Sequence, residues 1–270
     1  MTSAPVCRPR VCVIGAGVMG LSAAWQLALR GVDVLVVDRR EPGAEASAAN
    51  AGTLAVQNKK TATIPLVMHA LGMWERMNDA LGIDIEYERR GGFRVAHNDE
   101  DVAKLEETAA AQRHVGARVE VLHQPHLARE APYLSPVVRA AAWCADDGMA
   151  NPLAYVRGLL RTCRRLRVAI WSGAEVTAIV PRGPREFNVE TDRGTIRCAE
   201  VLVAAGAWNA ALVRLVGLEL PVTTQIQQAL VTDDVPFFLP HVVTHVRGNL
   251  TVKQQRPGRL LIGGAWPGDG

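Results

Sequence analysis

Three glycines near the start of the chain have the spacing of a phosphate-binding turn. Gly15, Gly17 and Gly20 form the pattern G-x-G-x-x-G directly after the apolar run 11–14, and a helical pattern begins at Val18. We expect the first glycine to allow a tight turn, the second to let the backbone approach a pyrophosphate, and the third to let helix and strand pack closely. The N-terminus of that helix offers N–H groups and the positive end of a dipole to the same phosphates.

An acidic residue completes the predicted nucleotide site. A second strand is predicted over 32–37, which is apolar except for Asp33, and it is followed by Asp38, which lies eighteen residues after Gly20. In strand–helix–strand dinucleotide sites, a carboxylate about 20 residues beyond the glycines binds a ribose hydroxyl. The acid disfavours a 2′-phosphate and therefore NADP, but it does not separate NAD from FAD, because both contain an adenosine ribose. The alternative is a glycine-rich turn that binds nothing.

A stretch of small residues follows the second strand. Residues 39–54 are rich in alanine, and Ser47 and Asn50 supply hydrogen-bonding side chains within it. Small side chains let backbone N–H groups come close to a ligand. The pattern therefore predicts a ligand-binding loop, and the alternative is the start of a small-residue helix without a ligand.

Composition and charge exclude several classes of protein. The chain has 270 residues, 49% hydrophobic and 21% charged, with a net charge of +3. This length allows one large domain or two of ordinary size, and this charge is too small to indicate nucleic-acid binding. The arginine-rich run 157–167 is interpreted as a solvated helix face. No window is apolar for long enough to span a bilayer.

The cysteines indicate a reducing compartment. The chain has five, scattered and without a C-x-x-C pair, so we expect reduced thiols and no metal cluster. The first ten residues lack the apolar core of a signal peptide. A cytoplasmic location is expected, with peripheral attachment to the inner face of a membrane as an open alternative.

The middle of the chain departs from the regular alternation of strand and helix at its start. We expect a helix over 65–81, an exposed helix over 99–114 and short strands that include 84–89 and 220–222, with a terminal loop at 263–268. The predicted fold is α/β: a Rossmann-like domain with an inserted α+β domain built on a mixed or antiparallel sheet. The predicted ranges are 10–65 and 146–218 for the first domain, and 66–145 and 219–270 for the second.

Five further motifs follow in a fixed order. They are A-S-x-x-N-A-G at 46–52, D-G-x-x-N-P at 147–152, G-A-x-V at 173–176, A-A-G-A-W at 204–208 and G-x-L-L-I-G-G at 258–264. In this order they resemble the D-amino-acid oxidase family of FAD-dependent oxidoreductases, which includes glycine oxidase, sarcosine oxidase and D-amino-acid dehydrogenases. The run 52–59 is most similar to the small subunits of opine dehydrogenase and hydrogen cyanide synthase.

The resemblance implies that FAD lies extended across the first domain. It implies the glycines at the pyrophosphate, Asp38 at the adenosine ribose, Arg39 on the adenine side and the backbone of Val176 at the adenine. The full set of implied cofactor-binding residues is Gly15, Gly17, Val18, Met19, Gly20, Asp38, Arg39, Arg40, Ser47, Asn50, Ala51, Gly52, Leu54, Val176, Ala205, Gly206 and Trp208.

The resemblance also implies a reaction. A hydride passes from the carbon that bears an amine to the flavin, and the resulting imine hydrolyses, with an amino acid or small amine as substrate. No nucleophile and no metal is required, and no catalytic residue is assigned. Thr251 and Lys253 lie on a predicted strand that would line the substrate side, whereas Arg94, Arg247 and Arg259 are expected at the surface.

Two alternatives stay open beside this one. Relatives continue for about a hundred residues beyond the Gly-Gly turn, so a closing C-terminal segment is expected to be absent, and the chain would then be a truncated, non-catalytic fragment. The other alternative is an NAD-dependent Rossmann dehydrogenase, although the motifs at 46–52 and 204–208 favour FAD. A partner subunit or a separate electron acceptor is compatible with the resemblance.

Overall fold

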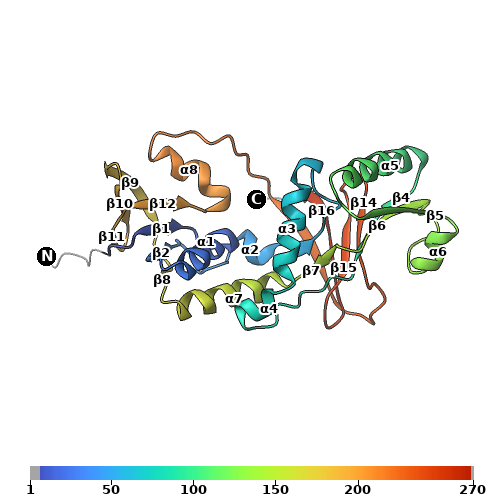
Figure 1. The fold of residues 1–270 in the computed structure, drawn as a ribbon, viewed down its shortest axis with the longest axis horizontal. Helices are drawn as coiled ribbons and strands as arrows, with labels where there is room; N and C mark the ends of the chain where they lie inside the picture. Colours follow the sequence, from blue (N-terminus) through green and yellow to red (C-terminus); the bar gives the residue numbers. More distant parts are fainter. Residues whose placement is uncertain (1–6, 269–270) are drawn as a thin grey trace. The chain divides into compact units, whose positions relative to one another are not determined.

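The computed structural model describes residues 7–268, and these form two compact units (Figure 1). The first unit comprises the described residues up to Asn50 together with Leu81–Ile85 and Pro152–Thr224. The second unit comprises Ala51–Ala80, Glu86–Asn151 and the described residues from Gln225 onward. Both units are discontinuous in sequence.

The boundaries of these units differ from the predicted ranges at 51–65, 146–151, 81–85 and 219–224. The pairing of β3 (Thr53–Leu54) with β7 (Gly148–Met149) joins two of these segments inside the second unit. The third packs in the first unit, because a Cβ at Gly158 would lie 2.8 Å from Leu81 Cδ1. Long-range pairing and packing of this kind leave no signal in local composition.

The first unit is built on a parallel sheet with the order β12-β1-β2-β8. Every residue of β1 (Val11–Ile14) and β2 (Val34–Val37) is buried, as expected for apolar strands covered on both faces. β8 (Ala169–Trp171) and β12 (Glu200–Val203) flank them. The predicted Rossmann-like core is therefore confirmed.

Different layers cover the two faces of this sheet. Helix α1 (Val18–Leu29) buries Leu21, Ala24 and Trp25 at helical spacing, and α7 (Pro152–Arg165) contacts it through the Ser22 Oγ to Tyr155 OH hydrogen bond of 3.3 Å. On the other face, a cluster containing Cys12, Ile14, Leu35 and Val37 packs on a three-stranded antiparallel sheet. The strands of that sheet are β9 (Val176–Gly183), β10 (Glu186–Thr191) and β11 (Gly194–Cys198). The remaining helices of the first unit are α2 (Ala46–Ala49), η2 (Gly206–Trp208) and α8 (Asn209–Arg214).

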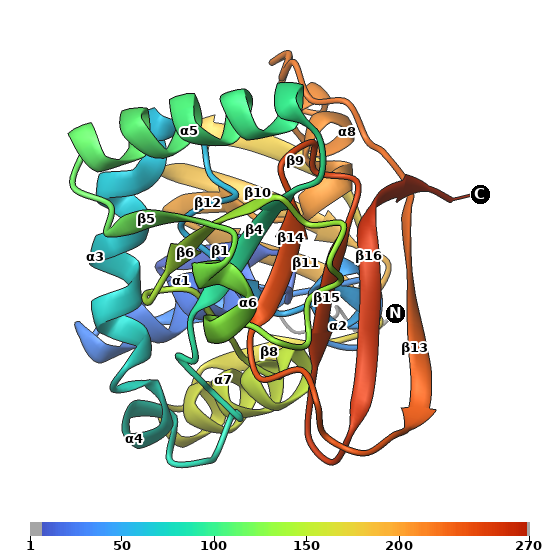
Figure 2. The same cartoon turned by 90° about the vertical axis from the view of Figure 1, so that its right-hand side faces the viewer.

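The second unit is built on a seven-stranded mixed sheet with the order β13-β16-β15-β14-β4-β6-β5 (Figure 2). Only the β4–β14 pair is parallel, and the other neighbours are antiparallel. The strands are β4 (Gly92–Ala96), β5 (Val119–His123), β6 (Ala140–Cys144), β13 (Gln227–Asp234), β14 (Val242–His245), β15 (Thr251–Gln254) and β16 (Arg259–Pro267). The predicted mixed sheet is confirmed.

Helices cover both faces of this sheet. Ile64 and Leu71 of α3 (Ile64–Trp74) and Leu105 and Ala109 of α5 (Asp99–His114) pack on one face. Leu127 of α6 (His126–Glu130) packs on the other face with Phe93, Val95 and Val243. The helices η1 (Thr61–Thr63) and α4 (Met77–Leu81) complete the described elements.

Several predicted elements differ from those observed. Residues 84–89 form no strand beyond a single bridge at Glu88, because Glu86 has φ +54° and breaks the extended chain. Residues 220–222 are irregular, and the predicted helix 65–81 is divided between α3 and α4. The predicted loop at 263–268 is mostly strand, since β16 continues to Pro267 against β13. No helix within residues 7–268 combines the length and apolar character needed to cross a membrane.

Asp147 is a buried carboxylate that fixes the backbone of the second unit. It accepts a hydrogen bond from Val56 N at 2.7 Å and another from Gln57 Nε2 at 3.1 Å, and the same amide donates to Gly92 O at 3.0 Å. Burial raises the pKa of Asp147 to about 6. Asp147 and the Gln57 amide together therefore join residues 56–57 to the start of β4. The burial of Asp147 in this network disfavours the ionised form of its carboxyl group.

This raised pKa predicts a pH-dependent stability. A carboxyl group whose folded pKa exceeds its unfolded value stabilises the fold below the unfolded pKa, and that contribution is lost as the pH rises through the folded value. We expect the wild-type unfolding free energy to lose about 2 kcal/mol relative to Asp147→Asn between pH 4 and pH 7, because burial raises the pKa of Asp147 from 3.8 to about 6. Urea unfolding of both proteins across this range measures the difference, and parallel pH profiles would contradict the expectation.

Candidate nucleotide and substrate site

The carboxyl ends of three parallel strands meet at one edge of the first unit's sheet. Gly15 follows β1, Asp38 follows β2 and Ala204 follows β12. Gly15 has φ +110°, and a Cβ there would lie 2.4 Å from Ala204 O. The glycine turn and the turn after β12 are therefore in direct contact, at the edge where ligands bind in open parallel sheets.

Gly17 and Gly20 are glycine for different physical reasons. A Cβ at Gly20 would lie 1.8 Å from Gly15 O, so packing of helix on strand alone requires this glycine. A Cβ at Gly17 would approach only Ser47, whose Oγ lies 2.9 Å away and can rotate. The fold itself therefore constrains Gly17 weakly, and an open backbone at this point fits close approach by a pyrophosphate.

The N-terminus of α1 is arranged for an anion. Gly17 is its N-cap residue, and no acidic residue lies in the first turn, so the positive end of the helix dipole is not neutralised locally. Val18 N donates to Ser47 Oγ at 3.0 Å, and this bond places the 46–49 helix beside the turn. Met19, the second residue of this helix, is 73% exposed.

Asp38 holds the glycine turn in place. Its Oδ2 accepts a hydrogen bond from Ala16 N at 2.7 Å, and its Oδ1 accepts one from Arg40 N at 2.9 Å. Sequence reasoning expected only a ribose contact here. A carboxylate has about four lone-pair positions, so acceptor capacity remains for a ribose hydroxyl.

The loop after Asp38 is closed by a cation–π contact. The guanidinium carbon of Arg39 lies 4.1 Å from the ring centroid of Trp208, and Arg40 Nη1 lies 3.0 Å from Glu45 Oε1. Asn50 Nδ2 donates to Ser47 O at 2.6 Å. The stretch 39–54 thus contains the short helix α2. Some polar side chains of this stretch bond to other residues within it and so stabilise its conformation.

Other predicted cofactor residues of the first unit lie in the turn 204–206 and at the start of β9. Ala205 N donates to Asn209 Oδ1 at 2.7 Å, which fixes the turn before Gly206, and Val176 opens β9 beside the parallel sheet. Ala51, Gly52 and Leu54 belong to the second unit. There Gly52 O accepts from Ala150 N at 2.9 Å.

Lys253 is the most unusual titratable residue of the second unit. Its side chain is fully buried, and its Nζ has no hydrogen-bond partner within the part of the chain that the structure describes. Burial lowers the pKa of Lys253 to about 7. Because side chains alternate along a strand, Lys253 and Thr251 share one face of the sheet, together with Thr244, which pairs with Thr251.

Arg94 lies on the same sheet face and is not the surface residue that we predicted. It is half-buried and donates to Gln57 O and Val246 O, each at 2.7 Å, and burial lowers its pKa. Arg247 is tied to Asp101 and Glu100, and Arg259 is exposed beside Asp234. Sequence reasoning missed Arg94 because its burial depends on segments far away in the chain.

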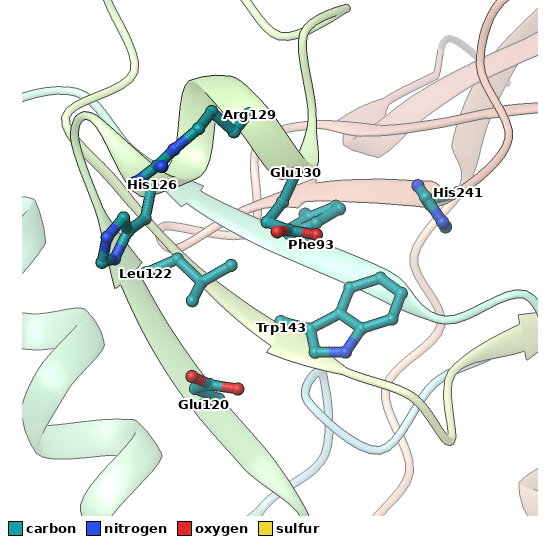
Figure 3. A pocket seen from close by; sticks show the side chains of 8 residues that line it. All are labelled: Phe93, Glu120, Leu122, His126, Arg129, Glu130, Trp143 and His241. Carbon is teal, nitrogen blue, oxygen red and sulfur yellow. The ribbon is translucent and has the colours of Figure 1, made fainter.

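A hollow of about 640 Å³ lies on the opposite face of the same sheet (Figure 3). Phe93 and Trp143 are lateral neighbours in the sheet and, with His241, form its aromatic lining. Arg94 is the next residue after Phe93 and therefore points to the other side. The hollow is separate from the face that carries Lys253.

Comparison with known proteins shows the family to which this chain belongs. Residues 10–270 match the family described as FAD dependent oxidoreductase, and the chain belongs to this family. It is 32% identical to glycine oxidase of Pseudomonas aeruginosa over 94% of this chain and 70% of that protein. It is 28% identical to a subunit of the opine oxidase of Rhizobium meliloti over 93% of this chain and 69% of that protein.

The fold agrees with this membership. The crystal structure of glycine oxidase from Geobacillus kaustophilus superimposes with a TM-score of 0.91 and 25% identity, covering 98% of this chain and 73% of that one. The predicted family, the predicted fold class and the cofactor FAD are thereby confirmed. The individual FAD and substrate contacts predicted from the sequence stay predictions.

The residues present fit a dinucleotide. The backbone at Gly17 is open to approach, the dipole of α1 is not neutralised, and Asp38 keeps acceptor capacity beside the turn. These are the requirements for a pyrophosphate and an adenosine ribose. The alternative of a glycine-rich turn that binds nothing is inconsistent with membership of an FAD family.

Asp38→Ala tests the ribose contact. We expect the affinity for FAD to fall by about 10–100-fold, because a hydrogen bond to a charged group contributes about 1.5–3 kcal/mol. FAD titration measures the effect, and far-UV circular dichroism shows whether the glycine turn has collapsed. Asp33→Ala is the matched control, since Asp33 is an exposed acid just before the same strand. Equal FAD affinities of Asp38→Ala and wild type would show that Asp38 contacts only the backbone of its own loop and does not bind the ribose.

Proposed function

We propose that this protein oxidises the C–N bond of an amino acid or small amine and produces an imine that water hydrolyses. The observation that carries the proposal is family membership over residues 10–270 together with 32% identity to a glycine oxidase. Bound FAD would supply the hydride acceptor. The protein's own contribution would be to bind the cofactor, orient the substrate and set its protonation state.

For the cofactor, the first unit supplies most of the proposed contacts. Gly15, Gly17 and Gly20 with the start of α1 would hold the pyrophosphate, and Asp38 the ribose. The proposed contacts beyond these are Val18, Met19, Arg39, Arg40, Ser47, Asn50, Ala51, Gly52, Leu54, Val176, Ala205, Gly206 and Trp208.

For the substrate, we propose Lys253 as a general base with Thr251 beside it. At neutral pH a substrate amine is an ammonium ion and carries no lone pair, so it cannot release a hydride to form an imine. A neutral lysine amine can accept one proton from that ammonium and leave a free amine. The burial of Lys253 and the absence of a partner at its Nζ among residues 7–268 support this role, because a pKa of about 7 keeps the base substantially neutral.

Anaerobic reduction of the FAD-loaded protein tests the function. Purified protein is saturated with FAD and mixed with glycine, sarcosine, D-alanine or L-proline, and bleaching of the flavin absorbance is followed. We expect at least one amine to bleach the flavin, whereas the corresponding 2-hydroxy acids do not. A protein that binds FAD but is bleached only by hydroxy acids would contradict amine oxidation, and preferential binding of NAD would favour the dehydrogenase alternative.

The electron acceptor is a separate part of the proposal. Similarity to one subunit of an opine oxidase supports a partner protein or a separate electron acceptor. Turnover with an artificial dye that greatly exceeds turnover with oxygen is expected in that case. Equal rates with oxygen and dye would favour a self-sufficient oxidase.

A further inference from the structure

Two histidines and an aspartate converge in the second unit, on side chains that the proposed oxidation does not use. His97 Nδ1 lies 2.9 Å from His245 Nε2. Asp101 Oδ2 lies 3.4 Å from the first of these nitrogens and 3.6 Å from the second. Three potential metal-ligand atoms from two segments, 97–101 and the end of β14, therefore face a common point.

Their separations are those of a tetrahedral zinc site. With metal–ligand bonds of about 2.0–2.1 Å, ligands at the corners of a tetrahedron lie ~3.3 Å apart. The three observed separations of 2.9, 3.4 and 3.6 Å bracket this value. Two imidazoles and one carboxylate also match the protein ligand set of zinc sites that keep a fourth position for water.

The fold brings His245 from a distant strand to His97 and Asp101, which are four residues apart in sequence. His245 ends β14 and His97 follows β4, and these strands pair in parallel, so both residues lie at the carboxyl ends of neighbouring strands. Asp101 lies in the first turn of α5. Its backbone N–H donates to the N-cap side chain of Asn98 at 2.8 Å, which fixes that turn.

The second carboxylate oxygen of Asp101 is held by a separate partner. Arg247 Nε lies 2.6 Å from Asp101 Oδ1, and Arg247 Nη2 lies 3.0 Å from Glu100 Oε1. The guanidinium orients the fully buried carboxylate. Asp101 Oδ2 accepts a hydrogen bond from Asn98 Nδ2 at 3.0 Å and also faces the two imidazoles, as outer partners orient a metal ligand.

The surroundings of His245 show which of its contacts a bound metal would change. His245 Nδ1 accepts the Arg247 N–H at 3.2 Å. Coordination of a metal through Nε2 would place the imidazole proton on Nδ1, so this hydrogen bond would break on metal binding. The side chain of Asn249 is hydrogen-bonded to His245 and provides a second-shell partner.

We propose that His97, Asp101 and His245 form a binding site for a divalent transition metal, best matched by Zn²⁺, with the fourth position open to solvent. His97 is 52% exposed, so the ion can enter from solvent and keep a water ligand. The bound ion links the ends of β4 and β14 to the first turn of α5. Its effect is a more stable second unit.

Zn²⁺ titration of the tag-free protein tests the site directly. Calorimetry is expected to give one Zn²⁺ per chain, and Zn²⁺ should raise the melting temperature. Co²⁺ used as a probe should give the intense visible absorption of a tetrahedral ion. His97→Ala removes an exposed ligand without disturbing the core and should lower the affinity by at least the 10–100-fold typical of losing a second-shell partner. The buried-ligand variant His245→Gln should have the same effect.

His123→Ala is the matched control. His123 is also 52% exposed and lies 3.2 Å from Glu106 Oε1, a carboxylate of α5. It should bind Zn²⁺ as the wild type does. The proposal is overturned if the wild type binds no Zn²⁺ at micromolar concentration, if Co²⁺ gives only an octahedral spectrum, or if His97→Ala and His123→Ala bind Zn²⁺ equally well.

Discussion

Gly17→Val is expected to abolish FAD binding while the protein remains folded. A Cβ at this position would meet only Ser47, whose hydroxyl can turn away, and the valine side chain would occupy the space that a pyrophosphate needs. Hydrogen bonds to charged groups contribute about 1.5–3 kcal/mol each, so loss of even two weakens binding by more than about 100-fold. FAD fluorescence titration measures affinity, and circular dichroism with thermal melting reports the fold.

Two further glycine variants make this test specific. Gly20→Ala should unfold the first unit, because its Cβ would lie 1.8 Å from the backbone oxygen of Gly15, which cannot rotate away. Gly72→Val is the matched control, since a Cβ at Gly72 meets nothing within 4 Å. Unfolding of Gly17→Val would show that Gly17 serves packing. An unchanged FAD affinity in a folded Gly17→Val protein would show that the pyrophosphate does not bind at Gly17.

The nucleotide-binding half could be predicted because its determinants are local. The apolar runs 11–14 and 32–37, the glycines and Asp38 fall within one strand–helix–strand unit, so spacing along the chain reports their proximity in space. The hydrogen bond from Ala16 N to Asp38 belongs to the same unit, yet its geometry depends on a side-chain orientation that sequence spacing does not report.

The second unit was less predictable because its important residues meet through strand register. Arg94, Thr251 and Lys253 share a sheet face only because β4, β14 and β15 pair as they do, and more than 150 residues separate the first from the others. His97 and His245 are neighbours for the same reason. The spacing of residues along the chain does not predict these strand pairings.

Lys253→Met is expected to lower the rate of substrate-dependent flavin reduction by about 10²–10⁴-fold, the usual contribution of a general base. Methionine has a similar length, and no hydrogen bond of Nζ to another of residues 7–268 is lost, so the fold and FAD affinity should persist. Lys104→Met, on the exposed side of α5, is the matched control and should behave as wild type. Anaerobic stopped-flow measurement of flavin bleaching gives the rate.

The pH dependence of kcat/KM shows whether Lys253 acts as a general base or has another role. The active form is the neutral amine, so wild-type kcat/KM should rise as the pH increases through about 7 and fall below it, and Lys253→Met should lose this limb. Lys253→Arg distinguishes the main alternative. Because a guanidinium stays charged, arginine cannot accept the proton and should be as slow as methionine. If Lys253→Arg instead keeps the wild-type rate, Lys253 acts as a cation that holds a substrate carboxylate. If Lys253→Met keeps both the rate and the limb, the buried amine has no part in the reaction and the proton passes to another group.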